Sequence, residues 1–266
     1  MRERLTSTDG VTVSYSRYGS GPPLVLVHGS FDDDSTNWEF VKPILRERFT
    51  LYAVARRGRG DTDATERHRL EDEATDVVAV IHAIGEPVFL LGHSYGAHCS
   101  LAAAALVPER VRKLVLYEPA WPSALSLDAL ERLERLAAAG AWDDFSLTFF
   151  RDLLLVPVAD LEALRSTPLW APTVADAKAS LGDLRAMSRY DFRPQDFKGL
   201  DIPVLLQVGS ESPRHLYVTD ALSTILPDVR IQELPGQAHE GMKTAPEVYA
   251  EAVIGFLLGA PDRQAG

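Results

Sequence analysis

Residues 88–106 read VFLLGHSYGAHCSLAAAAL, and this stretch decides the fold. Its first four residues, Val88 to Leu91, are all apolar, which is typical of a strand buried on both faces. The motif G-x-S-x-G follows directly at 92–96, and the Ala- and Leu-rich residues 95–106 favour a helix. Such a sharp turn strains the backbone of Ser94 and exposes its hydroxyl at the carboxyl edge of a sheet. We therefore predict that Ser94 is a nucleophile; the alternative is a serine that only caps the helix.

Apolar runs and helical patterns alternate along most of the chain. Asp9-Gly10 separates two short alternating segments and predicts a β-hairpin at the start of the sheet. Between the apolar runs, apolar residues recur at helical spacing, as in 70–84, whose acidic start suits a helix N-terminus. This alternation predicts an α/β fold with a doubly wound, mostly parallel sheet. The other candidate strands are 24–27, 49–54, 111–117, 203–208 and 229–234.

Residues 119–200 interrupt this alternation. They contain several helical patterns, many aromatic residues and no good candidate for a strand. An insertion of about 80 residues is too long to be a plain loop. We therefore expect residues 1–118 and 201–266 to form the core, and 119–200 to form a helical cap, or lid.

Composition narrows the class of protein. The 266 residues include 38 acidic and 27 basic side chains, and an acidic surface repels phosphate backbones, so we expect no nucleic-acid partner. The single cysteine, Cys99, can form neither an internal disulfide nor a multi-thiolate metal site. The adjacent carboxylates of 32–34 favour a solvated turn over a metal site. No apolar run could cross a bilayer and no signal-peptide core is evident, so we expect a cytoplasmic protein without a membrane span.

A second motif, His28-Gly29-Ser30-Phe31, follows the candidate strand 24–27. If that strand neighbours the one before Ser94, the two loops lie side by side. The backbone N–H of Ser30, with that of Phe31 as an alternative, can then join the N–H of Tyr95 in an oxyanion hole. We expect His28 itself to be structural and to bond the backbone of its loop.

A third motif surrounds His239. The chain has seven histidines, and His239 follows both the serine turn and the helical insertion. It lies in the Gly-flanked loop 235–241, after the last candidate strand. This position fits the chain order nucleophile, acid, histidine, so we predict that His239 is the general base; an exposed loop histidine is the alternative.

These motifs together resemble the α/β-hydrolase fold family, in its serine-nucleophile branch with a helical cap. The resemblance runs through 28–31, 57–60, 92–96, 114–119, 236–239 and 246–247, and so covers nearly the whole chain. It implies Ser94 as nucleophile, His239 as base, and the N–H groups of Ser30 and Tyr95 as oxyanion donors. One departure is Ala55, which stands where the family usually carries the Asp of D-x-R-G, and from it we expect a local cost in stability.

The family completes a catalytic triad with a carboxylate that pairs with the histidine. This acid is the second departure from the family pattern. The usual loop G-x-x-D here reads Gly209-Ser210-Glu211-Ser212, with Ser212 where the Asp is expected. Glu211 stands one residue earlier, and its longer side chain could compensate, so Glu211 is the preferred acid. The alternative is that Glu211 has no catalytic role and is either solvated or caps a helix. Glu118 is the alternative acid, because some members take the acid from the end of the strand 111–117.

The predicted reaction is acyl transfer to water through an acyl-enzyme, as in a serine carboxylesterase, with no cofactor. An aromatic-rich cap indicates a small, apolar ester or lactone as substrate. Three other reactions on the same residues stay open, namely hydrolysis of a C–C bond, perhydrolysis and thioester hydrolysis. A non-hydrolytic ligand-binding or cyclase member of the fold is the alternative of another class, and a homo-oligomer is left open.

Overall fold

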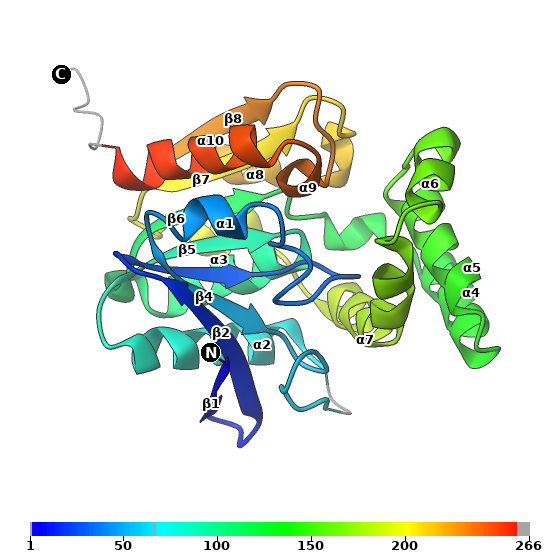
Figure 1. The fold of residues 1–266 in the computed structure, drawn as a ribbon, viewed down its shortest axis with the longest axis horizontal. Coiled ribbons are helices and arrows are strands. Elements are labelled where there is room, and N and C mark those ends of the chain that lie inside the picture. The colour runs from blue at the N-terminus through cyan, green and yellow to red at the C-terminus, as the bar shows by residue number, and fades with distance from the viewer. Residues whose placement is uncertain (1, 66–67, 260–266) are drawn as a thin grey trace.

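The computed structural model describes residues 2–65 and 68–259, and the described residues form one mixed sheet flanked by helices (Figure 1). The strand order is β1-β2-β4-β3-β5-β6-β7-β8, with β1 and β2 antiparallel and the following strands parallel. This arrangement confirms the predicted α/β fold with a mostly parallel, doubly wound sheet. In chain order the strands are β1 (Arg2–Thr6), β2 (Thr12–Gly19), β3 (Pro23–Val27), β4 (Thr50–Ala55), β5 (Val88–His93), β6 (Val111–Tyr117), β7 (Val204–Gly209) and β8 (Val229–Leu234).

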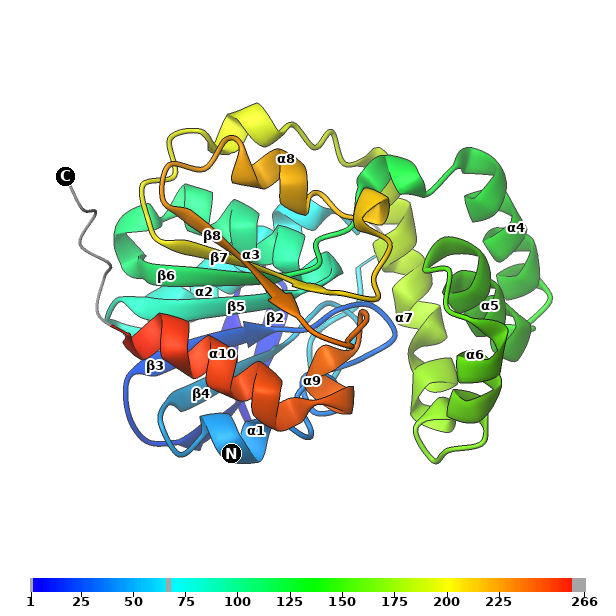
Figure 2. The same ribbon diagram turned by 90° about the horizontal axis from the view of Figure 1, so that it is seen from above.

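Helices cover both faces of the sheet because the central strands are apolar on both sides. Val25 and Val27 of β3 belong to one buried core, whereas Leu24 and Leu26 belong to the other. The first core includes residues of α2 (Leu70–Ile84), α3 (Tyr95–Leu106) and α8 (Thr219–Ser223). The second includes residues of α1 (Lys42–Leu45) and α10 (Pro246–Leu258), which lie on the opposite face (Figure 2). The short helix α9 (Gly241–Thr244) precedes α10.

The segment between β6 and β7 folds into helices. These are α4 (Leu127–Ala138), α5 (Trp142–Thr148), α6 (Val158–Arg165) and α7 (Trp170–Arg189). Ser126 caps α4 by accepting a hydrogen bond from the N–H of Ala129 at 3.2 Å. Within its described residues the segment adds no strand to the sheet; Ala120 makes an isolated bridge to Tyr217. The helices gather beyond the carboxyl ends of the strands (Figure 2).

These inserted helices have a small core of their own, and one of its members comes from elsewhere in the chain. Phe31, in the loop after β3, is buried among the rings of Phe145, Phe149 and Phe150, with ring centroids 4.4 to 5.8 Å away. The insertion and the main sheet are therefore packed together through the loop that carries Ser30.

Candidate active site

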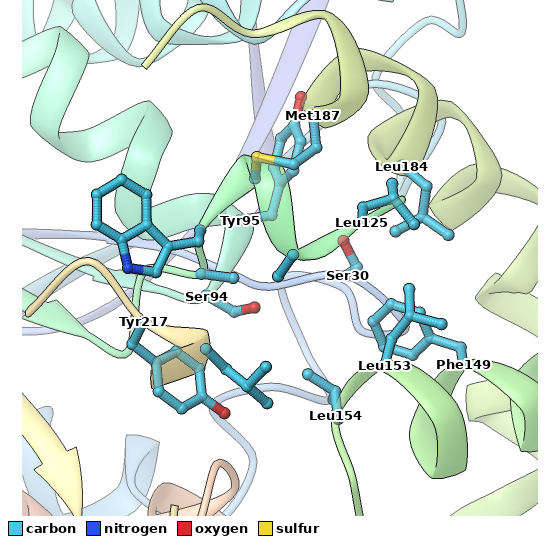
Figure 3. A pocket seen from close by; sticks show the side chains of 14 residues that line it. Ser30, Ser94, Tyr95, Leu125, Phe149, Leu153, Leu154, Leu184, Met187 and Tyr217 are labelled. Carbon is cyan, nitrogen blue, oxygen red and sulfur yellow. The ribbon is translucent and has the colours of Figure 1, made fainter. Parts of the chain in front are cut away.

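Ser94 makes the turn between β5 and α3. Its φ of 53° and ψ of −121° lie in a strained region for a non-glycine residue. A Cβ on Gly92 would lie 2.5 Å from the Oγ of Ser100, and one on Gly96 would lie 2.2 Å from the carbonyl oxygen of His28. Both positions therefore require glycine. Figure 3 shows the hydroxyl of Ser94 pointing into a pocket beneath the inserted helices.

The loop after β3 lies against this turn. A Cβ on Gly29 would lie only 3.1 Å from the Cβ of Ser94. Ser30 and Tyr95 line the same pocket as Ser94 (Figure 3). The N–H of Phe31 donates to a serine hydroxyl of α7 at 2.7 Å, so this alternative oxyanion donor is already engaged. The structure thus brings Ser30 and Tyr95 to the same pocket as Ser94.

His239 is paired with Glu118. The carboxylate oxygen Oε2 of Glu118 lies 2.7 Å from Nδ1 of His239, and Oε1 accepts a hydrogen bond from the N–H of Gly209 at 2.7 Å. A carboxylate can only accept, so Nδ1 carries a proton and Nε2 is left as the acceptor when the ring is neutral. The Glu118 side chain is fully buried, and both of its oxygen atoms are bonded.

The surroundings of His239 keep its ring oriented. The ring of Tyr217 stacks on it at 5.4 Å with an interplanar angle of 16°, and the ring of His93, next to Ser94, lies 4.7 Å away. Burial by itself would lower the pKa of His239, but the hydrogen bond and the charge of Glu118 outweigh burial and raise the pKa. The pair therefore favours the imidazolium form of His239.

The expected hydrogen bond between Glu211 and His239 is wrong. The carboxylate of Glu211 is exposed and accepts from the hydroxyl of Ser210 at 3.0 Å, while its backbone N–H donates to Gln237. Gly209, at the end of β7, is packed so closely under Gln237 that an added Cβ would lie 2.1 Å from its carbonyl oxygen. The carboxylate of Glu211 thus bonds within its own loop, whereas Glu118 reaches His239 from the end of the neighbouring strand.

The pocket at Ser94 is lined almost entirely by apolar side chains. Leu184 and Met187 come from α7, and Tyr217 follows β7 of the main sheet (Figure 3). Trp121, which also lines the pocket, lies at the start of the inserted segment. No Asp, Glu, Lys, Arg or His is among the described residues that line it. The remaining apolar lining residues are Ala120, Ala124, Leu125, Phe149, Leu153, Leu154 and Leu216.

The three carboxylates of residues 32–34, which follow Ser30, do not point toward a common centre. Asp32 pairs with Lys243 at 2.7 Å, Asp33 accepts hydrogen bonds from the N–H groups of Ser35 and Thr36, and Asp34 pairs with Arg2. Each carboxylate is held by its own partners. The expected solvation of this turn is wrong, because the side chains of Asp32 and Asp34 are only 5% and 0% exposed and pair with cations.

His28 bonds the backbone, as expected. Its Nδ1 donates to the carbonyl of Gly29 at 2.7 Å and its Nε2 accepts from the N–H of Arg56 at 3.2 Å. Burial and the nearby arginines hold the pKa of His28 well below its usual value, which suits a neutral structural ring.

Sequence reasoning missed a buried carboxylate that contacts the Ser30 loop. Asp183, in the middle of α7, accepts a hydrogen bond from the hydroxyl of Ser30 at 2.8 Å. The signal that could have found it is the run Arg56-Arg57-Gly58-Arg59, because buried arginines require carboxylate partners.

The sequence profile of the alpha/beta hydrolase family matches residues 24–252. The chain belongs to this family. Family membership supports hydrolase activity, and the strand order and serine turn described above agree with it. None of the helices in residues 2–65 and 68–259 is long and apolar enough to cross a membrane.

Individual relatives cover nearly the whole chain. A 2-(acetamidomethylene)succinate hydrolase from Mesorhizobium japonicum is 28% identical over 268 residues, which span 93% of this chain and 92% of the relative. Among solved structures, an alpha/beta hydrolase from Sphaerobacter thermophilus superposes with a TM-score of 0.84 at 30% identity, covering 96% of this chain and 100% of that one. An enol-lactonase from Burkholderia xenovorans shares the fold, with a TM-score of 0.79 at 19% identity over 96% of this chain and 100% of that one.

Proposed function

We propose that this alpha/beta hydrolase is a serine hydrolase that cleaves a carboxylic ester or lactone through an acyl-enzyme. Ser94 is the nucleophile, His239 the general base and Glu118 the acid of the triad. The observation that carries the proposal is the strained serine turn at the same sheet edge as the buried His239–Glu118 pair. Three elements supply these three residues, as the fold requires for such a triad.

Acylation follows from the protonation state of His239. The Oγ of Ser94 attacks the substrate carbonyl carbon while its proton passes to Nε2 of His239. The resulting imidazolium is stabilised by Glu118 and then protonates the departing alkoxide, which leaves as the alcohol. A water molecule, deprotonated by His239, next attacks the acyl carbon and releases the carboxylic acid and Ser94.

The oxyanion of each tetrahedral intermediate meets the N–H groups of Ser30 and Tyr95. The N-terminus of α3 points toward the same place and adds a favourable field. Each such donor contributes on the order of 3 kcal/mol to the stability of the transition state.

The pocket lining supports an uncharged, apolar substrate. The substrate named for the Mesorhizobium relative is a succinate, which carries two carboxylates, and such an anion needs basic partners. The described lining of the pocket offers none, so an apolar acyl or alcohol group fits better than a dicarboxylate. We propose that helices α4–α7 act as the cap that shapes this pocket.

An active-site label and a substrate series test the proposal. We expect turnover of p-nitrophenyl butyrate and labelling of the peptide that carries Ser94 by a fluorophosphonate. Ser94→Ala should lower kcat by roughly 10⁴-fold or more, because the covalent route needs the hydroxyl.

Ser100→Ala, a buried hydroxyl on the same helix, is the matched control and should keep the label. The proposal is wrong if Ser94→Ala retains the rate of the unaltered enzyme. A thioester substrate, and hydrogen peroxide in place of water as the acyl acceptor, are tested in parallel. They show whether the same acyl-enzyme serves thioester hydrolysis and perhydrolysis.

A further inference from the structure

A buried group of charged side chains lies where α2, the loop after β4 and α7 meet. Arg56 and Arg59 come from the loop, Glu73 from α2 and Asp183 from α7, and each of these side chains is at most 2% exposed. His68 closes the group on the solvent side. The mechanism proposed above uses none of these five residues.

Asp183 is the centre of this group. Its Oδ2 accepts from Arg56 at 2.6 Å and from Arg59 at 2.7 Å, and its Oδ1 accepts from the same two residues at 3.0 and 2.9 Å. A third hydrogen bond to Oδ2 comes from the hydroxyl of Ser30 at 2.8 Å. The carboxylate therefore joins two buried cations to Ser30, the proposed oxyanion donor.

Arg56 and helix α7 also bind the neighbouring residues of the loop. Arg56 donates to the carbonyl oxygens of His28 at 2.9 Å and Gly29 at 3.0 Å. One turn before Asp183, the hydroxyl of Ser180 accepts from the N–H of Phe31 at 2.7 Å. Phe31 has a φ of 61°, which is costly for an aromatic residue and persists only under such restraint. Each of residues 28–31 is thus bonded either to α7 or to an arginine that α7 holds.

A metal site is the competing interpretation, because one ligand atom each from His68, Glu73 and Asp183 lies within 4.8 Å of the others. Arg56 and Arg59 already occupy the carboxylate of Asp183, and Arg56 also binds Glu73 at 3.2 Å. Two guanidinium groups at the ligands repel a cation. The contacts support positioning rather than metal binding.

We propose that Asp183 is a positioning residue, which fixes the N–H of Ser30 at the oxyanion and so couples the inserted helices to catalysis. The inference rests on the proposed function, because it assumes that an oxyanion forms beside Ser30. A shift of the loop by a fraction of an ångström would weaken the hydrogen bond in the transition state while leaving the apolar pocket intact.

The test compares Ser30→Ala and Asp183→Asn on an ester and on the matching thionoester. Sulfur is larger and a poorer acceptor than oxygen, so a well-placed oxyanion hole favours the ester. The ratio of the two rates cancels the amount of folded enzyme. We expect the ratio of the ester rate to the thionoester rate to fall by roughly 10-fold or more in both variants. The kcat on the ester should fall by a similar factor with KM little changed, because one oxyanion donor is worth about 10²–10³ in kcat.

Two controls match these variants in burial and chemistry. Asp76→Asn removes the charge and one acceptor oxygen from the bidentate contact of Asp76 with Arg57 at 2.7 and 3.0 Å, which includes no residue of 28–31. Ser146→Ala removes a buried hydroxyl of α5. Both should leave the ratio unchanged. If Asp183→Asn does not fold, Ser30→Ala still decides, since it removes a single hydroxyl and keeps the N–H.

The outcomes separate the two proposals. An unchanged ratio in Ser30→Ala, with an active parent enzyme and an inactive Ser94→Ala, overturns the positioning role and leaves the serine hydrolase standing. A parent enzyme that turns over neither ester nor thionoester overturns the proposed function, and the positioning role falls with it.

Discussion

Glu118 shows how a single backbone conformation can select a functional residue. Its φ of 47° is unusual for a glutamate and costs on the order of 1–3 kcal/mol. The conformation turns the side chain from the end of β6 toward β7 and the His239 loop, where hydrogen bonds to Gly209 and His239 use both oxygen atoms. Ser94, on the neighbouring strand, is held in a comparable strained state. Strain at two adjacent strand ends is consistent with a site that holds its groups in place before substrate binds.

We expect Glu118→Gln to lower kcat by roughly 10²–10⁴-fold, because the amide no longer selects the tautomer of His239 or stabilises its charged form. Glu211→Gln is the matched control, since its exposed carboxylate contacts Ser210. Its kcat should stay close to that of the parent. Steady-state kinetics on p-nitrophenyl butyrate measure both, and a large loss in Glu211→Gln would contradict this assignment.

At the scale of elements, the sequence predicts the strands and helices better than it predicts contacts between distant segments. The apolar runs and the G-x-S-x-G turn predict the parallel strands, α2 and α3, because burial on both faces and a tight turn leave local marks in the sequence. The partner of His239 leaves no such mark. It depends on how β6, β7 and β8 are aligned and on the positive φ of Glu118. The family spacing points to Ser212, which favours the neighbouring Glu211 and leaves Glu118 as the alternative.

The loop after β3 is one of the elements that join the insertion to the main sheet, and Phe31 anchors it. Its ring is 3% exposed and packs among three phenylalanines of the insertion. We expect Phe31→Ala to lower the free energy of unfolding by about 3–5 kcal/mol, through lost burial and a cavity. Phe40→Ala, at a ring that is 40% exposed, should cost far less. Urea denaturation followed by circular dichroism measures both, and equal losses would show that Phe31 is no anchor.

For the whole molecule, the buried charged group makes stability depend on pH in two directions. Contacts with Arg56 and the other cations overcome burial and hold the pKa of Glu73 at about 2, and Asp183 also lies well below its usual value. These carboxylates stabilise the fold above the pKa of the unfolded chain, near 4, and that contribution is lost as the pH falls toward 2. His68 acts in the opposite sense: burial would lower its pKa, but Glu73 and Asp183 raise it to about 9.

His68 therefore predicts a loss of stability on the alkaline side. The folded protein keeps the His68 proton up to a pH of about 9, whereas the unfolded chain releases it near 6.5. Its contribution is complete below pH 6.5 and disappears as the pH rises through 9, a change of about 3 kcal/mol. Urea unfolding at pH 6 and pH 9.5 should show this decline in the parent. The control His82→Gln, which replaces an exposed histidine of α2, should show the same decline, and His68→Gln should show a much smaller decline. A decline of equal size in His68→Gln would assign it to other groups, because His68 is the member of this buried cluster that releases its proton in this range.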